Sequence, residues 1–146
     1  MDGLLRRFKF HQDLAAGRVL SELMAARCAA LPRPQALVPV SLHRHRLRQR
    51  GYDQALELAR PLGRALQLPC LPLLRRVRAT APQSELDADE RRRNLRDAFL
   101  AHGPLPTHVA LVDDVMTTGA TLHAAAQALR RAGVQRVDAW VCARVP

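Results

Sequence analysis

The chain has few aromatic residues, one lysine and no long hydrophobic run. Its aromatic side chains are three Phe, one Tyr and one Trp in 146 residues. Proteins that bind single-stranded nucleic acid by stacking interleave aromatic and basic side chains, so this composition argues against a stacking module. No apolar stretch approaches the roughly 20 residues that span a bilayer, and the first eight residues do not resemble a signal peptide. We therefore expect a cytoplasmic protein without membrane insertion.

Cysteine is also scarce. The chain has three, Cys28, Cys70 and Cys142, which are far apart and form no C-x-x-C pair. This spacing gives neither a metal-ligand set nor a disulfide framework. Because each lies in an apolar stretch, we interpret all three as buried thiols.

Positive charge is in excess, and it is almost entirely arginine. The chain has 23 Lys and Arg against 13 Asp and Glu, a formal net charge of +10, and Lys9 is its single lysine. Such a balance favours polyanionic partners, such as phosphorylated metabolites, diphosphate or nucleic acid. Genome composition can produce the same arginine bias, so charge alone does not choose among these partners.

Length and composition predict one globular domain. The alternation of expected strands and helices along the chain predicts the α/β class, with a parallel sheet flanked by helices. We divide it into an N-terminal helical extension (residues 1–35) and a core (residues 36–146). Asp13 and either Asp53 or Gln54 are expected to begin helices, and Pro61 is expected to kink or end the second one. Helices are expected at 13–31, 53–66 and 121–132, and strands at 36–40, 71–74, 97–101, 109–112 and 137–145. Residues 75–93 are polar and long for a connection, which favours a mobile functional loop.

The most informative segment covers residues 109–122. An apolar run at 109–112 leads into Asp113 and Asp114, and a Thr/Gly loop then leads into a helical pattern. The run predicts a buried parallel strand whose carboxyl end carries both acids, which is where open α/β sheets bind ligands. The loop N–H groups and hydroxyls can hold a phosphate, which leaves the acids for ribose hydroxyls, a bound cation, or both. The loop residues are Thr117, Thr118, Gly119, Ala120 and Thr121.

A purely structural interpretation of this segment also stays open. The acids could simply end a strand, and Thr117 or Thr118 could cap a helix. Two adjacent like charges at a strand end cost electrostatic energy unless a cation or hydroxyl donors offset it. That cost favours a ligand site.

The segment resembles the phosphoribosyl diphosphate (PRPP) motif of type I phosphoribosyltransferases. The resemblance implies a Rossmann-like fold with a small N-terminal helical hood. It also implies that Asp113 and Asp114 contact the ribose 2′- and 3′-hydroxyls and act indirectly on Mg²⁺, while the loop wraps the 5′-phosphate. The expected ligand and cofactor are therefore PRPP and Mg²⁺.

A Mg²⁺-bound diphosphate needs a second anion pocket, usually at another strand-to-helix turn. The expected strand at 36–40 is the only other one that leads into a strongly basic turn. A charged run can equally be a solvated face. The candidates for the diphosphate and acceptor side are Val40, Ser41, Arg44, Arg46, Arg50, Arg78 and Gln83.

A further resemblance covers almost the whole chain. The segment Arg50-Gly51-Tyr52-Asp53-Gln54 is similar to the Arg-Gly-Phe-Asn-Gln segment of the ComF family, phosphoribosyltransferase-like proteins associated with DNA uptake and use. Lys9-Phe10-His11 and several residues between 78 and 99 also follow the family's order. Tyr52 and Asp53 replace the family's usual Phe and Asn. Many members carry a zinc module ahead of the Lys-Phe-His stretch; we expect it to be absent here, and we expect no zinc.

Three functions remain open at this point. The first is a PRPP-binding transferase of the competence and DNA-utilisation type, which would transfer a pentosyl group in nucleoside metabolism with loss of diphosphate. The second is a non-catalytic accessory protein that binds single-stranded DNA or a competence helicase. The third is a sensor of PRPP or nucleotides. The expected partners are a ribose phosphate, single-stranded DNA, the helicase and a second copy of the chain, and the acceptor cannot be read from the sequence.

Overall fold

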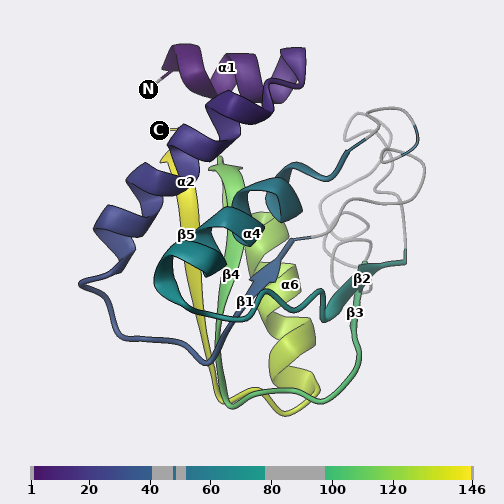
Figure 1. The fold of residues 1–146 in the computed structure, drawn as a ribbon. Coiled ribbons are helices and arrows are strands. Elements are labelled where there is room, and N and C mark those ends of the chain that lie inside the picture. The colour runs from purple at the N-terminus through teal and green to yellow at the C-terminus, as the bar shows by residue number, and fades with distance from the viewer. Residues whose placement is uncertain (1, 41–47, 49–51, 78–97, 146) are drawn as a thin grey trace, which may run out of the picture.

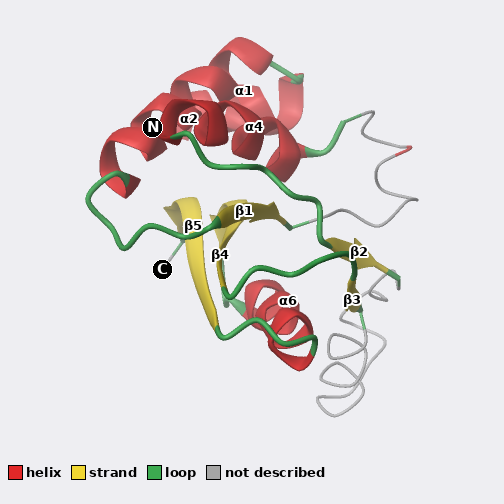
Figure 2. Cartoon of the chain, turned by 60° about the horizontal axis from the view of Figure 1, so that its bottom comes forward, coloured by secondary structure: helices red, strands yellow, loops and turns green. Residues whose placement is uncertain are grey.

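The computed structural model describes residues 2–40, 48, 52–77 and 98–145. Helices cover both faces of a parallel three-stranded sheet with the order β1-β4-β5 (Figure 1). Three helices, α1, α2 and α4, lie on one side of the sheet, and α6 lies on the other (Figure 2). A separate antiparallel pair, β2-β3, lies beside them. The elements are α1 (Asp2–His11), α2 (Leu14–Cys28), β1 (Ala36–Pro39), α4 (Gln54–Leu66), β2 (Leu74–Arg76), β3 (Phe99–Ala101), β4 (His108–Met116), α6 (Ala120–Arg131) and β5 (Arg136–Arg144).

The central strand β4 divides the hydrophobic core into two halves. Successive side chains of a strand point to opposite faces of the sheet. Val109 and Leu111 therefore pack with α6, while Ala110 and Val112 pack with the layer of α1, α2 and α4. All four are fully buried, as expected for a parallel strand covered on both faces. This confirms the α/β prediction and the buried strand before the acid pair.

Two helices begin at the aspartates that the sequence predicted. The Asp13 carboxylate accepts the Ala16 N–H at 3.0 Å, and the Asp53 carboxylate accepts the Leu56 N–H at 3.3 Å. Each carboxylate satisfies one of the N–H groups that a helix start leaves without an intrahelical partner. The helix α2 ends at Cys28, short of the expected residue 31.

The sequence predicted a helical extension over residues 1–35 but no separate helix before Asp13, where the structure has α1. Its Phe8 side chain is fully buried, and the ring lies so close to Gly17 that a Cβ added there would come within 2.6 Å of it. The Tyr52 hydroxyl donates to the Phe8 carbonyl, and the Gln54 side-chain amide donates to the Lys9 carbonyl at 3.0 Å. These donors satisfy carbonyls near the end of α1, where the helix itself has no partner to offer. Tertiary contacts therefore hold α1 in place against α2 and α4.

The structure narrows one further expectation and corrects another. The helix α4 does not end at Pro61, which leaves a kink as the remaining expectation, because the proline removes a single helix N–H while Leu58 and Leu62 bury both halves of the helix in the same core. The strand expected at 71–74 lies instead at Leu74–Arg76 and pairs with β3. The segment before it makes only an isolated bridge to β1, since Pro69 and Pro72 have no N–H to donate to a ladder.

The three cysteines are free thiols that are half-buried, less buried than the sequence suggested. Burial raises the pKa of Cys28 and of Cys70. No helix in the described parts of the chain is long and apolar enough to cross a bilayer.

Candidate functional site

The acid pair lies at the carboxyl end of the central strand, as the sequence predicted. The strand continues to Met116, so Asp113 and Asp114 lie within its last residues rather than after its end. The neighbouring strand β1 ends at the same edge, where the Val40 N–H donates to the Val112 carbonyl at 3.0 Å. Val40, the residue that follows β1, therefore lies close to the acid pair.

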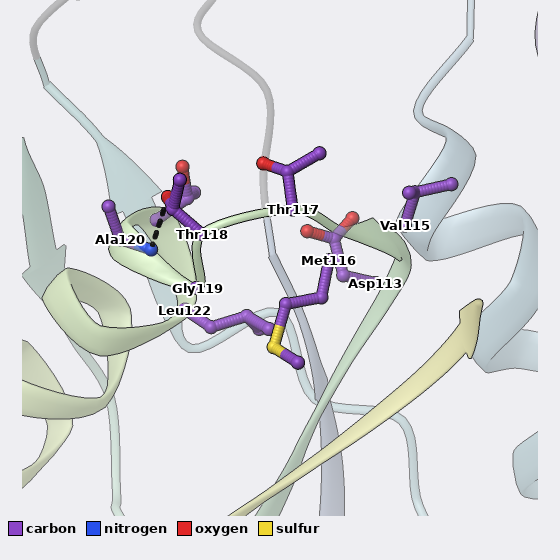
Figure 3. Close-up of a pocket in the computed structure, with 9 residues that line it drawn as sticks. Asp113, Val115, Met116, Thr117, Thr118, Gly119, Ala120 and Leu122 are labelled. Atoms are coloured by element: carbon purple, nitrogen blue, oxygen red, sulfur yellow. Dashed lines mark hydrogen bonds between the residues drawn. The ribbon is translucent and has the colours of Figure 1, made fainter. Parts of the chain in front are cut away.

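Asp113 and the following loop line one small pocket, of about 70 Å³. Figure 3 shows the loop residues along its rim and Asp113 on the strand that leads into the loop. The sequence placed these residues in one site, and the structure brings them together. The lining residues are Asp113, Val115, Met116, Thr117, Thr118, Gly119, Ala120, Thr121 and Leu122.

The loop turns into α6 through a left-handed glycine. Gly119 has φ +82° and is the N-cap of α6, without a side-chain cap. The Thr118 hydroxyl accepts the Ala120 N–H at 3.3 Å, so a threonine does assist the helix start, although it is not the N-cap. The first N–H that bonds within the helix is that of His123, to the Gly119 carbonyl at 2.9 Å. The N–H groups of the first turn lie next to the pocket with their partial positive charge, which is the arrangement of an anion site.

Asp114 does not line this pocket. Its side chain is 7% exposed and accepts the Val115 N–H at 2.8 Å through Oδ1. The second oxygen, Oδ2, is buried and has no hydrogen-bond partner among the described residues. The pKa of Cys142 on β5 is raised to about 12, first by burial and then by the negative charge of Asp114. The charge of Asp114 therefore also reaches β5.

Asp113 is a carboxyl group whose ionised form is disfavoured. Burial, followed by the charge of Asp114, raises its pKa from 3.8 to about 7. The Asp114 N–H, which donates to Asp113 at 2.9 Å, opposes this shift. Within the described chain no cation pairs with Asp113, so a ligand that brings hydroxyl donors or a cation would stabilise its charged form.

The effect of Asp53 on this site is not among the features predicted from the sequence. Its charge also raises the pKa of Asp113, which places the start of α4 within electrostatic reach of the acid pair. The sequence does carry a signal for this effect, because Asp53 occupies a position that is usually Asn in the ComF family. The substitution keeps the helix cap and adds a third negative charge near the site.

Most of the expected diphosphate and acceptor side lies outside the described residues. This holds for Ser41, Arg44, Arg46, Arg50, Arg78 and Gln83, and for residues 78–93 of the expected functional loop. Val40 is described, and it is buried at the end of β1. The roles of these residues stay predictions.

Of the acid pair, Asp113 is the member that could face a magnesium ion held mainly by its ligand. Mg²⁺ prefers oxygen ligands and usually keeps waters or substrate phosphates in its shell. Asp113 offers one carboxylate at the pocket, while no group of three or more His, Cys, Asp or Glu residues that could cage an ion occurs in the described ranges. The residues present therefore fit an indirect role toward Mg²⁺.

Comparisons with known proteins agree with this fold. The model of the phosphoribosyl transferase domain family matches residues 53–146. Competence protein F of Haemophilus influenzae is 40% identical over 152 residues, which cover 97% of this chain and 66% of that protein. DNA utilization protein YhgH of Escherichia coli K12 is 36% identical, with coverage of 97% and 66%, and competence protein ComFC of Bacillus subtilis is 31% identical, with coverage of 91% and 55%. The chain thus spans two thirds or less of the length of these relatives.

Two solved structures share the fold. The allosteric regulatory enzyme of purine biosynthesis matches with a TM-score of 0.57 at 21% identity, over 86% of this chain and 25% of that one. The UMP synthase of Leishmania donovani matches with a TM-score of 0.53 at 17% identity, over 97% and 29%. The chain therefore belongs to the phosphoribosyl transferase domain family, as a relative of competence protein F and the DNA utilization protein YhgH.

Proposed function

We propose that this chain binds a phosphorylated ribose, PRPP or a related compound, at the carboxyl end of β4. The observation that carries the proposal is that Asp113 lines the same pocket as the loop that opens α6. A carboxylate that can accept hydrogen bonds from hydroxyl groups and a set of backbone N–H donors thus lie at the same pocket. A ribose 5-phosphate carries the complementary groups.

In this proposal the 5′-phosphate occupies the loop pocket. The first-turn N–H groups of α6 and the hydroxyls of Thr117, Thr118 and Thr121 donate to its oxygens. The pocket of about 70 Å³ is smaller than the roughly 300–1,000 Å³ of small-molecule sites. It therefore has room for the phosphate group alone, and the sugar extends toward Asp113. The ribose hydroxyls then donate to the Asp113 carboxylate and stabilise its charged form.

The chain's own groups would act by position and charge if transfer occurs. In such a reaction an acceptor forms a bond to C1 of PRPP while the bond from C1 to the diphosphate oxygen breaks. Mg²⁺, when bound, would neutralise the departing diphosphate. Asp113 would hold the ribose in place, and buried Asp114 would add negative charge near a sugar that becomes electron-poor at C1.

Calorimetry with PRPP and Mg²⁺ tests the binding. We expect heat of binding with the original chain and an affinity at least roughly tenfold lower with Asp113→Asn, which loses one charge-assisted contact. Glu22→Gln, an exposed carboxylate on α2, is the matched control and should bind like the original chain. No heat with the original chain, or equal affinity in Asp113→Asn, would contradict the proposal. Release of diphosphate in the presence of candidate acceptors then separates a transferase from a sensor.

Single-stranded DNA binding is the second candidate function. It is favoured by the net charge of +10 and by the name of the YhgH relatives, which are DNA utilization proteins. A titration with an oligonucleotide at increasing salt should show an affinity that falls steeply. No binding at low salt would exclude this candidate.

A further inference from the structure

A second pocket lies in the helical layer, away from the loop. It has a volume of about 230 Å³ and shares no lining residue with the pocket at Asp113. Arg18 of α2 and Arg60 and Arg64 of α4 line it, together with Glu57. Phe8, Leu14 and Pro61 supply an apolar wall. The pocket therefore combines a basic rim with an apolar surface.

The charge of this pocket is not balanced among the described residues. Three guanidinium groups face one carboxylate, a surplus of two positive charges. None of the three arginines forms an ion pair within the described parts of the chain. Arg60 and Arg64 are also four residues apart on one helix, where like charges are neighbours and repel each other. A dianion in the pocket would offset this repulsion.

The walls of the pocket are held in place before any ligand arrives. The buried Ser21 hydroxyl lies 2.9 Å from the Gly17 carbonyl and 3.0 Å from the Leu58 carbonyl, which joins α2 to α4. The Phe8 ring packs on Gly17, and Gln54 joins α4 to the end of α1. A pocket with fixed walls loses little conformational freedom on binding.

We propose that this pocket binds a phosphate monoester that carries an apolar or aromatic group, such as a nucleoside monophosphate. A terminal phosphate has a charge of about −1.5 to −2 near pH 7, which matches the surplus of the pocket. Arginine is suited to it, since its planar fork can donate two parallel hydrogen bonds to phosphate oxygens. The wall of Leu14 and Pro61 offers contact to the organic part of the ligand. A backbone phosphodiester carries a single charge and matches the pocket less well.

The test uses AMP as the probe and two double variants of equal charge. Arg60→Ala/Arg64→Ala removes two charges from the pocket, and Arg27→Ala/Arg130→Ala removes two exposed charges elsewhere, on α2 and α6. All four arginines are exposed, so both variants should fold like the original chain. Calorimetry gives the affinity, and the amide signals of ¹⁵N-labelled protein give the place of binding.

We expect the pocket variant to bind AMP roughly tenfold or more weakly and the control variant to bind within about twofold of the original chain. The amide signals of Arg18, Arg60 and Arg64 should shift in the original chain. The proposal is overturned if AMP does not bind, if both double variants lose affinity equally, or if AMP shifts only residues 117–122. It is also overturned if an oligonucleotide without a terminal phosphate binds the arginine pocket and AMP does not.

Discussion

Asp113 and Asp114 are adjacent at the carboxyl end of β4, and of the two only Asp113 lines the loop pocket. The alternation of the strand dictates this arrangement. Asp113 follows Val109 and Leu111 on the side of α6, where the loop begins. Asp114 is in register with Ala110 and Val112 and is buried, and its charge adds to the effect of burial on the pKa of Asp113.

Asp113→Asn should make the free protein more stable above pH 7. Because the pKa of Asp113 is about 7 in the folded chain and 3.8 ordinarily, the folded form keeps a proton that the unfolded chain has lost between these values. The stability of the original chain therefore falls as pH rises from about 4 to about 7. The Asn side chain has no such cost, and we expect a gain of about 1–3 kcal/mol at pH 8. Urea unfolding at pH 4 and pH 8 measures this, and equal stability at pH 8 would contradict the raised pKa.

Asp53→Asn should strengthen binding of ribose 5-phosphate at pH 7. Asn caps a helix as well as Asp does, so α4 should keep its start. Loss of the negative charge lowers the pKa of Asp113 and favours the ionised carboxylate that accepts from ribose hydroxyls. We expect a gain of about twofold, because one partly screened charge is worth on the order of 0.5 kcal/mol.

Asp53→Ala separates the two roles of this residue. It removes the same charge together with the cap, so it should also lower the free energy of unfolding by about 1 kcal/mol. An affinity that falls in both variants would show that Asp53 acts on the ligand directly.

Gly119→Ala should weaken phosphate binding more than its effect on stability explains. Gly119 has φ +82°, a left-handed conformation that costs other residues about 1–2 kcal/mol. Gly133→Ala is the control, because Gly133 has φ +112°, lies after α6 and has open space around it. Both variants should lose stability in thermal unfolding. Calorimetry with ribose 5-phosphate should show a loss of affinity in Gly119→Ala alone; equal affinities in the two variants would contradict the role of the loop.

Gly17→Ala should destabilise the protein although alanine is the better helix former. The added Cβ would lie 2.6 Å from the buried Phe8 ring, so the ring or α1 must move. We expect a loss of about 1–3 kcal/mol in urea unfolding, as for overpacked cores. Gly3→Ala in α1 has open space around it and should be neutral or stabilising by up to about 1 kcal/mol. A stabilising Gly17→Ala would mean that α1 does not pack on α2 as described.

The elements that the sequence predicted well are those specified by nearby residues. Asp13 and Asp53 mark helix starts because a cap bonds to an N–H three residues later. The four apolar residues before Asp113 predict both a strand and its burial. The loop at Gly119 follows from the same short segment.

The features that the sequence did not predict depend on distant partners. The helix α1 relies on donors from Tyr52 and Gln54, more than forty residues away. The strand at Leu74–Arg76 exists because Phe99–Ala101 pairs with it, across a long stretch of sequence. The raised pKa of Asp113 comes first from burial and then from the charges of Asp114 and Asp53, and only the folded structure brings these about.

The most direct test of a ribose-phosphate site at Asp113 and the loop is a titration of ¹⁵N-labelled protein with ribose 5-phosphate, followed through its amide signals. We expect saturable shifts at Asp113 and at residues 117–122, and we expect them to disappear in Asp113→Asn at equal ligand concentration. Shifts confined to other parts of the chain, or no shift at these residues, would contradict it.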